Sequence, residues 1–449
     1  MTQARVLLVD DTAVIRSFMA AFLKEAGYSV QTAFDGQDCL DRMDREPSDL
    51  IVLDVEMPVL DGLATCKIVT QRHKHVPVIM FSTLTARGAD TTLEGLYAGA
   101  SDYLIKPSGL GNRDEVREYL RGNLVPKIEQ LLAEARRRKE AVAAQPPPAS
   151  AEPEAGRPEP NAPTPEAVSA KPEASPPEVK APPVEKTPAE VQAPPAERPQ
   201  APRRSAPPPA PKASAPKERV RTPLEARANT GLPPLSADGG LRLAEPALRN
   251  HGVRLVAIGV STGGPRALEV VLTALPAGFS VPIAIVQHMP AYFTKSLADS
   301  LNAKCRIRVH EAAAGMVLEA GHIYIAPGEH HLKIVSQGGA FVVKLDEGLP
   351  VNFCKPSVDV MFNSLAEAEL GSGVLAVVLT GMGSDGLEGA KRLKARGASV
   401  LAQDQASSVV WGMPGYVARA GIADAVLPLG DVAAELVKRT PPLRPAQAA

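Results

Sequence analysis

Short apolar runs alternate with amphipathic segments throughout residues 1–140. Each apolar run predicts a buried strand, and segments such as 14–26 and 89–98 have the 3.6-residue periodicity of helices. Five strands and five helices in alternation predict a doubly wound parallel sheet, in which ligands bind at the carboxyl ends of the strands. The predicted strands are Arg5–Val9, Ser29–Phe34, Leu50–Leu53, Val78–Phe81 and Tyr103–Ile105.

A second alternating region covers residues 251–449. Its apolar runs predict a second α/β domain with a mostly parallel, doubly wound sheet. Three further runs, separated by Pro-Gly and Gly-Gly turns, predict an inserted antiparallel β-meander at His322–Ala326, His331–Ser336 and Ala340–Leu345. The predicted strands of the main sheet are Arg254–Ile258, Val281–Gln287, Leu375–Thr380 and Ser399–Ala402.

The segment between these regions has a different composition. Residues 146–216 contain 23 prolines in 71 positions, and no aromatic residue occurs between Tyr119 and Phe279. Such a segment cannot bury enough apolar surface to offset the entropy lost on ordering, so we expect it to be disordered. The predicted organisation is a domain at 1–125 with a helical extension to about 140, a linker at 141–250, and a second folded domain at 251–449.

Overall composition excludes several classes of protein. The net charge is −1, so no strong field favours nucleic acid or an anionic membrane. The N-terminus lacks the pattern of a signal peptide, and no apolar run approaches the roughly 20 residues of a membrane span. The four cysteines form no CxxC pair and no metal-binding spacing. We therefore expect a soluble cytoplasmic protein without nucleic-acid binding or membrane insertion.

Polar side chains gather at the strand ends of the first domain. Asp10 and Asp11 follow the first strand, Asp54 the third, Ser82 the fourth and Lys106 the fifth. A single Asp at a strand end is usually a helix cap or a turn residue. Three acids with a hydroxyl and a lysine at one edge are more specific, because clustered carboxylates need a cation and oxygen ligands suit Mg²⁺.

Residues 1–125 resemble a response-regulator receiver domain through the motifs LLVDD, LDVEMPVLDG, FSTLT and DYLIKP. The resemblance implies that Asp54 accepts a phosphoryl group. It also implies that Asp10, Asp11, Asp54 and the backbone carbonyl of Glu56 bind Mg²⁺.

The same resemblance assigns roles to three further residues. Ser82 and Tyr103 would be the switch pair, and Lys106 would contact the phosphoryl group.

The second domain contains a candidate nucleophile. Gly259-x-Ser261-x-Gly263 follows a strand and precedes a helix, as in a nucleophile elbow, although such a serine is more often a cap or phosphate-binding turn. His288 ends the next strand and Asp385 follows a later one, so both fall at the edge expected for Ser261. The order Ser, His, Asp disfavours the α/β-hydrolases, which run Ser, Asp, His.

A competing interpretation concerns the glycines around Asp385. Gly381-x-Gly383-x-x-Gly386 matches a dinucleotide-binding fingerprint, with Asp404 at a suitable distance. Against it, Asp385 would place a carboxylate where pyrophosphate must approach. The unit also comes late in its domain, whereas the fingerprint normally opens one.

Residues 253–438 resemble the catalytic domain of the chemotaxis protein-glutamate methylesterases (the CheB family). The matching motifs are AIGVSTGGP, VQHMP, IYIAPGEHHL, KPSVDVMF and LTGMGSDG. The resemblance implies that Ser261, His288 and Asp385 form a catalytic triad and that no cofactor serves the esterase. It also implies that the Met382 amide contributes to the oxyanion hole and that Thr262 lies in the site.

This resemblance implies a function for the whole chain. The enzyme would hydrolyse glutamate methyl esters on methyl-accepting chemoreceptors, releasing methanol, and would deamidate certain glutamines. The unphosphorylated receiver would cover the esterase cleft until a chemotaxis histidine kinase phosphorylates Asp54. We expect a monomer.

Three points qualify that picture. A linker of about 100 residues, longer than the short connector usual in the family, predicts a lower local concentration of the receiver at the cleft. A DNA-binding output would need a basic helical module, which residues 251–449 lack. A catalytically inactive regulator that only binds receptors remains the alternative.

Overall fold

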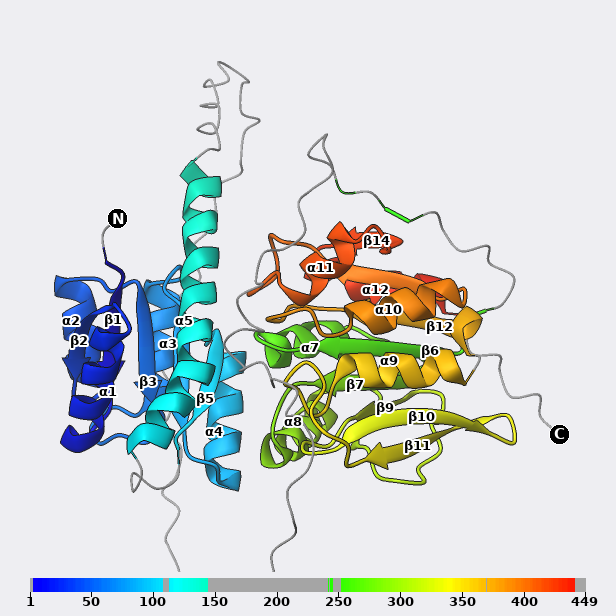
Figure 1. Cartoon of the computed structure of the whole chain (residues 1–449), viewed down its shortest axis with the longest axis horizontal. Coiled ribbons are helices and arrows are strands. Elements are labelled where there is room, and N and C mark those ends of the chain that lie inside the picture. Colours follow the sequence, from blue (N-terminus) through cyan, green and yellow to red (C-terminus); the bar gives the residue numbers. More distant parts are fainter. Residues whose placement is uncertain are drawn as a thin grey trace, which may run out of the picture. The chain divides into compact units, whose positions relative to one another are not determined.

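The computed structural model describes residues 3–107, 113–143, 241, 243–244, 252–368 and 370–440. The predicted linker at 141–250 lies almost entirely outside this range, so its disorder stays a prediction. None of the helices in the described parts combines the length and apolar character that a membrane crossing requires. The N-terminal and C-terminal domains are each described by themselves (Figure 1).

The N-terminal domain is a five-stranded parallel sheet in the order β2-β1-β3-β4-β5. The sequence predicted each strand to within one or two residues. The strands are β1 Arg5–Val9, β2 Ser29–Ala33, β3 Leu50–Asp54, β4 Val78–Ser82 and β5 Asp102–Ile105. The helices are α1 Ala13–Glu25, α2 Gly36–Arg45, α3 Gly62–Arg72, α4 Ala86–Tyr97 and α5 Arg113–Ala143.

Helices cover both faces of this sheet, which is why β3 and β4 are buried along their whole length. Val6 and Leu8 of β1 pack with α1 and α5, whereas Leu7 and Val9 face α2, α3 and α4. The alternation follows from the two-residue period of a strand. The doubly wound prediction is confirmed.

The C-terminal domain contains a seven-stranded sheet in the order β14-β13-β12-β6-β7-β9-β8, parallel throughout. Its strands are β6 Leu255–Val260, β7 Ile283–Gln287, β8 Arg308–Glu311, β9 His322–Ile325, β12 Val374–Val378, β13 Ser399–Gln403 and β14 Ala425–Leu427. The fold class is therefore confirmed.

The predicted three-stranded meander is wrong in one respect. Only β10 (His331–Gln337) and β11 (Ala340–Asp346) form an antiparallel pair, whereas β9 joins the main sheet in parallel between β7 and β8. A short apolar run near a turn does not reveal which sheet the strand joins. One of the two partners of β9 is β8, a strand that the sequence did not predict because its residues are mostly polar.

Two layers of helices enclose the main sheet (Figure 1). The helices are α7 Gly264–Thr273, α8 Ala291–Lys304, α9 Val358–Glu367, α10 Leu387–Ala395, α11 Met413–Arg419 and α12 Leu429–Arg439, with a 3₁₀ turn at Gly371–Gly373. Alternate residues of β6 face opposite layers: Val256 and Ile258 pack with α7, α8 and α12, whereas Leu255 and Ala257 pack with α9, α10, α11 and the β10–β11 pair.

Candidate active site

The central strand β6 sets the position of the site. Residues Val260 of β6 and Gln287 of β7 are paired, so Ser261 and His288 leave neighbouring strands at the same edge. On its other side β6 pairs with β12, and the loop after β12 carries Asp385. After β6 the chain adds β7 on one side of β6, and it later adds β12 and β13 on the other side. The carboxyl ends of these strands therefore form the topological switch point, where such sheets bind ligands.

The turn that carries Ser261 is closely packed. The Ser261 amide donates to the Thr380 carbonyl at 3.0 Å, and the Gln287 side-chain amide donates to the Ser261 carbonyl at 3.0 Å. Gly263 has φ 76°, and a Cβ on Gly264 would lie 1.9 Å from the Gln287 side-chain oxygen. Neither position accommodates a side chain without rearrangement, so the glycines belong to the geometry that exposes the serine.

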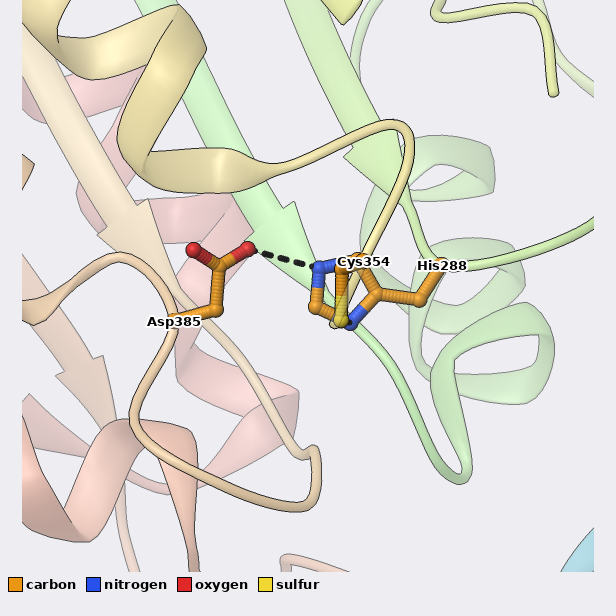
Figure 2. Close-up of side chains that lie close together, drawn as sticks. All are labelled: His288, Cys354 and Asp385. Carbon is orange, nitrogen blue, oxygen red and sulfur yellow. Dashed lines mark hydrogen bonds and ion pairs between the residues drawn. The ribbon is translucent and has the colours of Figure 1, made fainter. Parts of the chain in front are cut away.

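His288 is held by a carboxylate. Its Nε2 lies 2.8 Å from Oδ2 of Asp385, as Figure 2 shows. Asp385 is only 3% exposed. An ionised carboxylate only accepts hydrogen bonds, so Nε2 carries the proton and donates it to Asp385. Neutral His288 then has its lone pair on Nδ1, which is the nitrogen available to act as a base.

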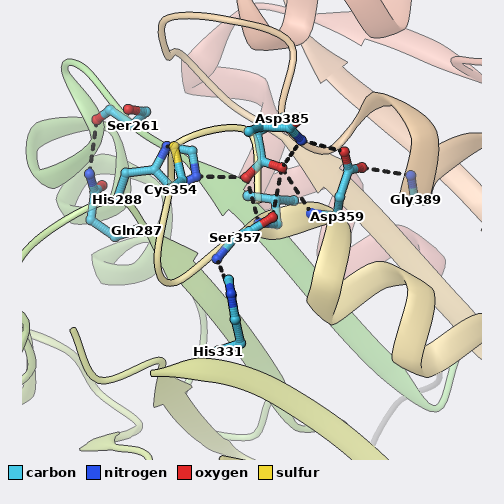
Figure 3. A network of polar contacts seen from close by, with 11 residues as sticks. Ser261, Gln287, His288, His331, Cys354, Ser357, Asp359, Asp385 and Gly389 are labelled. Atoms are coloured by element: carbon cyan, nitrogen blue, oxygen red, sulfur yellow. Dashed lines mark hydrogen bonds and ion pairs between the residues drawn. The ribbon is translucent and has the colours of Figure 1, made fainter. Parts of the chain in front are cut away.

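The N-terminus of α9 stabilises the negative charge of Asp385. Besides His288, the carboxylate accepts from the backbone amides of Val358 at 2.6 Å and Asp359 at 3.2 Å, and from the Ser357 hydroxyl at 2.8 Å. Asn352 donates to it as well, at 2.8 Å. Figure 3 shows Ser357 and Asp359 beside Asp385. These donors occupy both oxygens at the positive end of a helix.

Electrostatics follow from that network. Burial raises the pKa of Asp385, but the hydrogen bonds from His288, Asn352 and Val358 outweigh burial and lower the pKa to about 2. Neighbouring Asp359 behaves in the opposite way, because burial and the charge of Asp385 raise its pKa to about 6. One carboxylate is therefore kept ionised beside His288, as an orienting group must be.

Cys354 occupies the other side of the imidazole. Its Sγ lies 3.5 Å from Nδ1 of His288. A tight turn places it there: Val351 and Cys354 exchange backbone hydrogen bonds of 3.1 and 2.9 Å, and the two residues between them, Asn352 and Phe353, have φ of 53° and 63°. Such left-handed residues are found where function constrains the backbone.

Contact with the thiol contributes to the pKa of the imidazole. Burial lowers the pKa of His288, yet attraction to Cys354 and the hydrogen bond with Asp385 raise it to about 10. Cys354 is thus part of the site, although its sequence spacing gave no indication of it.

Ser261 is near this pair but is not bonded to it. Within the described parts of the chain, no hydrogen bond joins the Ser261 hydroxyl to His288. The structure therefore brings His288 and Asp385 into contact, and it places Ser261 on the adjacent strand end.

Two further predicted site residues lie in the same region. The carbonyl of Thr262 accepts from the Thr380 hydroxyl at 2.9 Å. Met382 belongs to the glycine turn after β12, and its backbone amide donates to no acceptor among the residues that the structure describes. An amide of this kind is available to an oxyanion.

The glycine turn itself argues against a dinucleotide. A Cβ on Gly381 would lie 2.8 Å from Cβ of Ser261 and 2.4 Å from Sδ of Met413. The close approach that this glycine permits is therefore to protein atoms. Asp385, at the same turn, faces the amides of α9 instead of leaving room for a phosphate.

The predicted acidic site of the N-terminal domain also assembles. Carboxylate oxygens of Asp10, Asp11 and Asp54 all lie within 4.8 Å of one another. The Lys106 ammonium lies 2.6 Å from Asp54 and 3.1 Å from Asp10. Burial raises the pKa of Asp54 to about 6, although Lys106 lowers it. Clustered carboxylate oxygens fit a hard divalent cation such as Mg²⁺.

The other predicted receiver residues have different surroundings. The Ser82 hydroxyl donates to the Gly88 carbonyl at 3.1 Å, and the Glu56 amide donates to Asp54 at 3.2 Å. Tyr103 lies on β5 beside Met80 of β4. No hydrogen bond links Ser82 with Tyr103 in the part of the chain described, so their coupling as a switch pair stays a prediction.

Sequence reasoning missed the residues that hold Asp385. Ser357 and Asp359 lie within KPSVDVMF, and Asn352 lies three residues before its start. Cys354, which contacts His288, directly precedes the motif. The family resemblance gives no role to any residue of this motif. A signal was present, because a Ser followed by an apolar stretch is a helix start, and helix starts bind anions. The identity of the anion required the fold.

Two family models match the chain. The model described as "CheB methylesterase" matches residues 256–436, and the model described as "Response regulator receiver domain" matches residues 6–120. These ranges fall within the two predicted domains.

Curated relatives match over almost the whole chain. A protein-glutamate methylesterase/protein-glutamine glutaminase from Trichodesmium erythraeum is 37% identical and covers 98% of this chain and 99% of its own. One from Maricaulis maris is 39% identical, covering 97% and 95%. A solved structure, the Thermotoga maritima CheB methylesterase catalytic domain, is 42% identical, covers 42% of this chain and 99% of its own, and has a TM-score of 0.41.

The two relatives align with almost the whole of this chain, so their overall lengths are similar. The weaker docking expected from the long linker at 141–250 stays a prediction.

Proposed function

The chain belongs to the protein-glutamate methylesterase/protein-glutamine glutaminase family, and on that premise we propose that its C-terminal domain is a serine hydrolase of protein side-chain esters and amides. The substrates would be glutamate methyl esters and certain glutamines on methyl-accepting chemoreceptors. The observation that carries the proposal is the His288–Asp385 pair on the strand end next to Ser261.

The proposed reaction has two steps. Ser261 Oγ attacks the ester carbonyl while Nδ1 of His288 takes its proton, and Asp385 stabilises the imidazolium through Nε2. The imidazolium returns the proton to the departing methoxide, which leaves as methanol. Water, deprotonated by the same nitrogen, then hydrolyses the acyl-enzyme to glutamate and Ser261. A glutamine substrate would release ammonia by the same steps.

The oxyanion would form beside the glycine turn. The unbonded Met382 amide and the Thr262 region are our candidates for stabilising it. Nδ1 also contacts Cys354, so this contact must be replaced by one between Nδ1 and the Ser261 hydroxyl during the reaction. No cofactor enters these steps.

A second nucleophile is favoured by one observation. Cys354, His288 and Asp385 make a continuous chain of contacts of 3.5 and 2.8 Å, which is the form of a cysteine triad. If Cys354 is the nucleophile, Cys354→Ser loses activity and Ser261→Ala does not. An inactive regulator, which only binds receptors, would show no activity in the native chain.

The distinguishing experiment measures methanol release from methylated receptor. We expect Ser261→Ala to lose activity about 10⁴-fold or more, as in other serine hydrolases, while Cys354→Ser retains most of it. A fluorophosphonate probe should label the native chain and Cys354→Ser but not Ser261→Ala. Full activity in Ser261→Ala would overturn the serine mechanism.

The N-terminal domain would control this activity. We propose that Asp54 is phosphorylated by a chemotaxis histidine kinase, with Mg²⁺ bound by Asp10, Asp11, Asp54 and the Glu56 carbonyl. Lys106 would neutralise the phosphoryl group, and Ser82 with Tyr103 would relay the change.

Phosphorylation would then release the esterase from inhibition by the receiver. We further propose a monomer that works in the cytoplasm, where receptor substrates are accessible. Methanol release with and without a small acyl phosphate tests the control. A rate that does not respond to the phosphodonor contradicts it.

A further inference from the structure

We propose that His288 and Cys354 form a chelating site for a thiophilic divalent metal ion, of which Zn²⁺ is the representative, and that occupation of this site blocks the base nitrogen. The blocking part rests on the proposed function, whereas metal binding does not. The two donor atoms, Nδ1 of His288 and Sγ of Cys354, lie 3.5 Å apart. Both belong to a group of side chains whose ligand atoms lie within 4.8 Å of one another.

The spacing matches that of a tetrahedral chelate. A Zn²⁺ ion at about 2.05 Å from nitrogen and about 2.3 Å from sulfur holds those two atoms ~3.5 Å apart. The distance between the two donor atoms in the protein therefore matches that of such a chelate. Imidazole and thiolate ligands also bind Zn²⁺ and Cu(I) in preference to Mg²⁺.

Asp385 supplies the third feature of such a site. Ligating histidines usually donate their other ring N–H to a carboxylate, which fixes the tautomer and increases the basicity of the bound nitrogen. Here Nε2 of His288 donates to Asp385 at 2.8 Å. Because Asp385 already accepts from Ser357, Val358, Asp359 and Asn352, it acts as that carboxylate and not as a direct ligand.

Cys354 is better suited to this role than the other thiols. Burial raises the pKa of Cys39 and Cys66 to about 12, and burial together with Glu269 raises that of Cys305 to about 11. Burial at those positions opposes the thiolate form that a metal ion needs. Cys354 instead lies 3.5 Å from an imidazole nitrogen, which supplies a second ligand.

The site differs from the acidic cluster of Asp10, Asp11 and Asp54. That cluster offers only oxygen ligands and suits Mg²⁺. Excess Mg²⁺ would therefore occupy the acidic cluster and leave the His288–Cys354 site to a thiophilic ion. With two protein ligands, the His288–Cys354 site leaves the remaining positions to water or to the Ser261 hydroxyl. Binding would be reversible, and each ion bound would release the proton of the thiol or of the imidazolium.

The test is a Co²⁺ titration of the full chain in excess Mg²⁺. Coordination by sulfur gives a thiolate-to-metal charge-transfer absorption in the near ultraviolet. We expect this band at one equivalent of Co²⁺, displaced by Zn²⁺, in the native chain and in Cys305→Ser. In Cys354→Ser the band should be absent and Zn²⁺ affinity lower by about tenfold or more.

A second measurement covers the case in which Cys354→Ser misfolds. Zn²⁺ should protect Cys354 of the native chain from alkylation, read by peptide mass spectrometry. A band that persists in folded Cys354→Ser overturns the proposal, as does a native chain with neither band nor protection.

The activity arm is separate. Zn²⁺ should inhibit methanol release and a chelator should restore it, with Cys354→Ser less sensitive. A band in a chain without esterase activity would leave metal binding intact and contradict the proposed function. Activity that is insensitive to Zn²⁺ despite a band contradicts only the blocking step.

Discussion

A buried carboxylate lies at the sheet edge of each domain, and the pKa values of the two are shifted in opposite directions. Asp54 ends β3 of the N-terminal domain with few hydrogen-bond donors besides Lys106 and the Glu56 amide, and burial raises its pKa to about 6. Asp385 is buried to a similar extent, but five donors, three of them at the start of α9, lower its pKa to about 2. Burial alone does not decide the charge of a carboxylate; the number and position of donors do.

This difference corresponds to different chemistry. A carboxylate with oxygen lone pairs left open can receive a cation and a phosphoryl group. A carboxylate whose lone pairs are all occupied can only orient and stabilise its partner, here His288. Both edges lie at switch points of doubly wound sheets, so the fold offers the place and the local donors determine the use.

The largest expected effect is at Asp54. Asp54→Asn should eliminate incorporation of a phosphoryl group from a small acyl phosphate, because the accepting oxygen nucleophile is lost. Intact-mass measurement detects the adduct. Asp61→Asn is the matched control: Asp61 caps α3 by accepting from the Ala64 amide at 2.7 Å, and Asn caps equally well. Incorporation of a phosphoryl group into Asp54→Asn would show that Asp54 is not the acceptor.

The next largest effect is expected at the sheet edge of the C-terminal domain. Asp385→Asn should lower the rate of methanol release about 10⁴-fold, because an amide cannot maintain the Nε2–H tautomer of His288. Asp359→Asn serves as its control, since Asp359 has a raised pKa and no contact with His288. We expect a far smaller loss there. Equal losses in the two variants would show that Asp385 has only a structural role.

The turn that exposes Ser261 offers a stability test. Gly264→Ala would place a methyl group 1.9 Å from the Gln287 oxygen and should destabilise the C-terminal domain by about 1–3 kcal/mol. Gly430→Ala, in α12 with nothing within 4 Å, should instead stabilise by about 0.4–1 kcal/mol. Urea unfolding followed by the fluorescence of Trp411, the single tryptophan, measures both. A neutral Gly264→Ala would mean that the turn relaxes freely.

The smallest effect concerns pH. Contact with Cys354 contributes to the raised pKa of His288, so Cys354→Ala should lower that pKa and increase the neutral, basic fraction. The rising limb of kcat/KM against pH should move to lower pH in Cys354→Ala and stay in place in Cys305→Ala. An unmoved limb in both variants would remove Cys354 from the electrostatics of the site.

Stability gives an independent check with the same sign. A raised pKa stabilises the folded state below the unfolded-state pKa of about 6.5, and that contribution is lost as pH rises through the folded value of about 10. Cys354→Ala should therefore lose stability relative to the native chain mainly at neutral and lower pH. The difference should vanish in alkaline solution.

The sequence by itself determined much of this protein. Periodicity located β1 to β7 and β9 to β13 to within a few residues, because the buried faces of these strands give short apolar runs. It also put Ser261, His288 and Asp385 at one edge, since residues that follow parallel strands leave the sheet on the same side. The polar strand β8 and the parallel pairing of β9 were beyond such reasoning.

Tertiary structure alone decided what surrounds the imidazole. The tight turn at Val351–Cys354 and the start of α9 bring Cys354 and the donors of Asp385 to His288 from 64 to 71 positions along the chain, counted from 288 to residues 352–359. No local pattern encodes such contacts, because pKa and ligand spacing depend on through-space distances of a few ångströms. The sequence supplied the reactive groups, and only packing fixed which nitrogen of His288 is held and which faces sulfur.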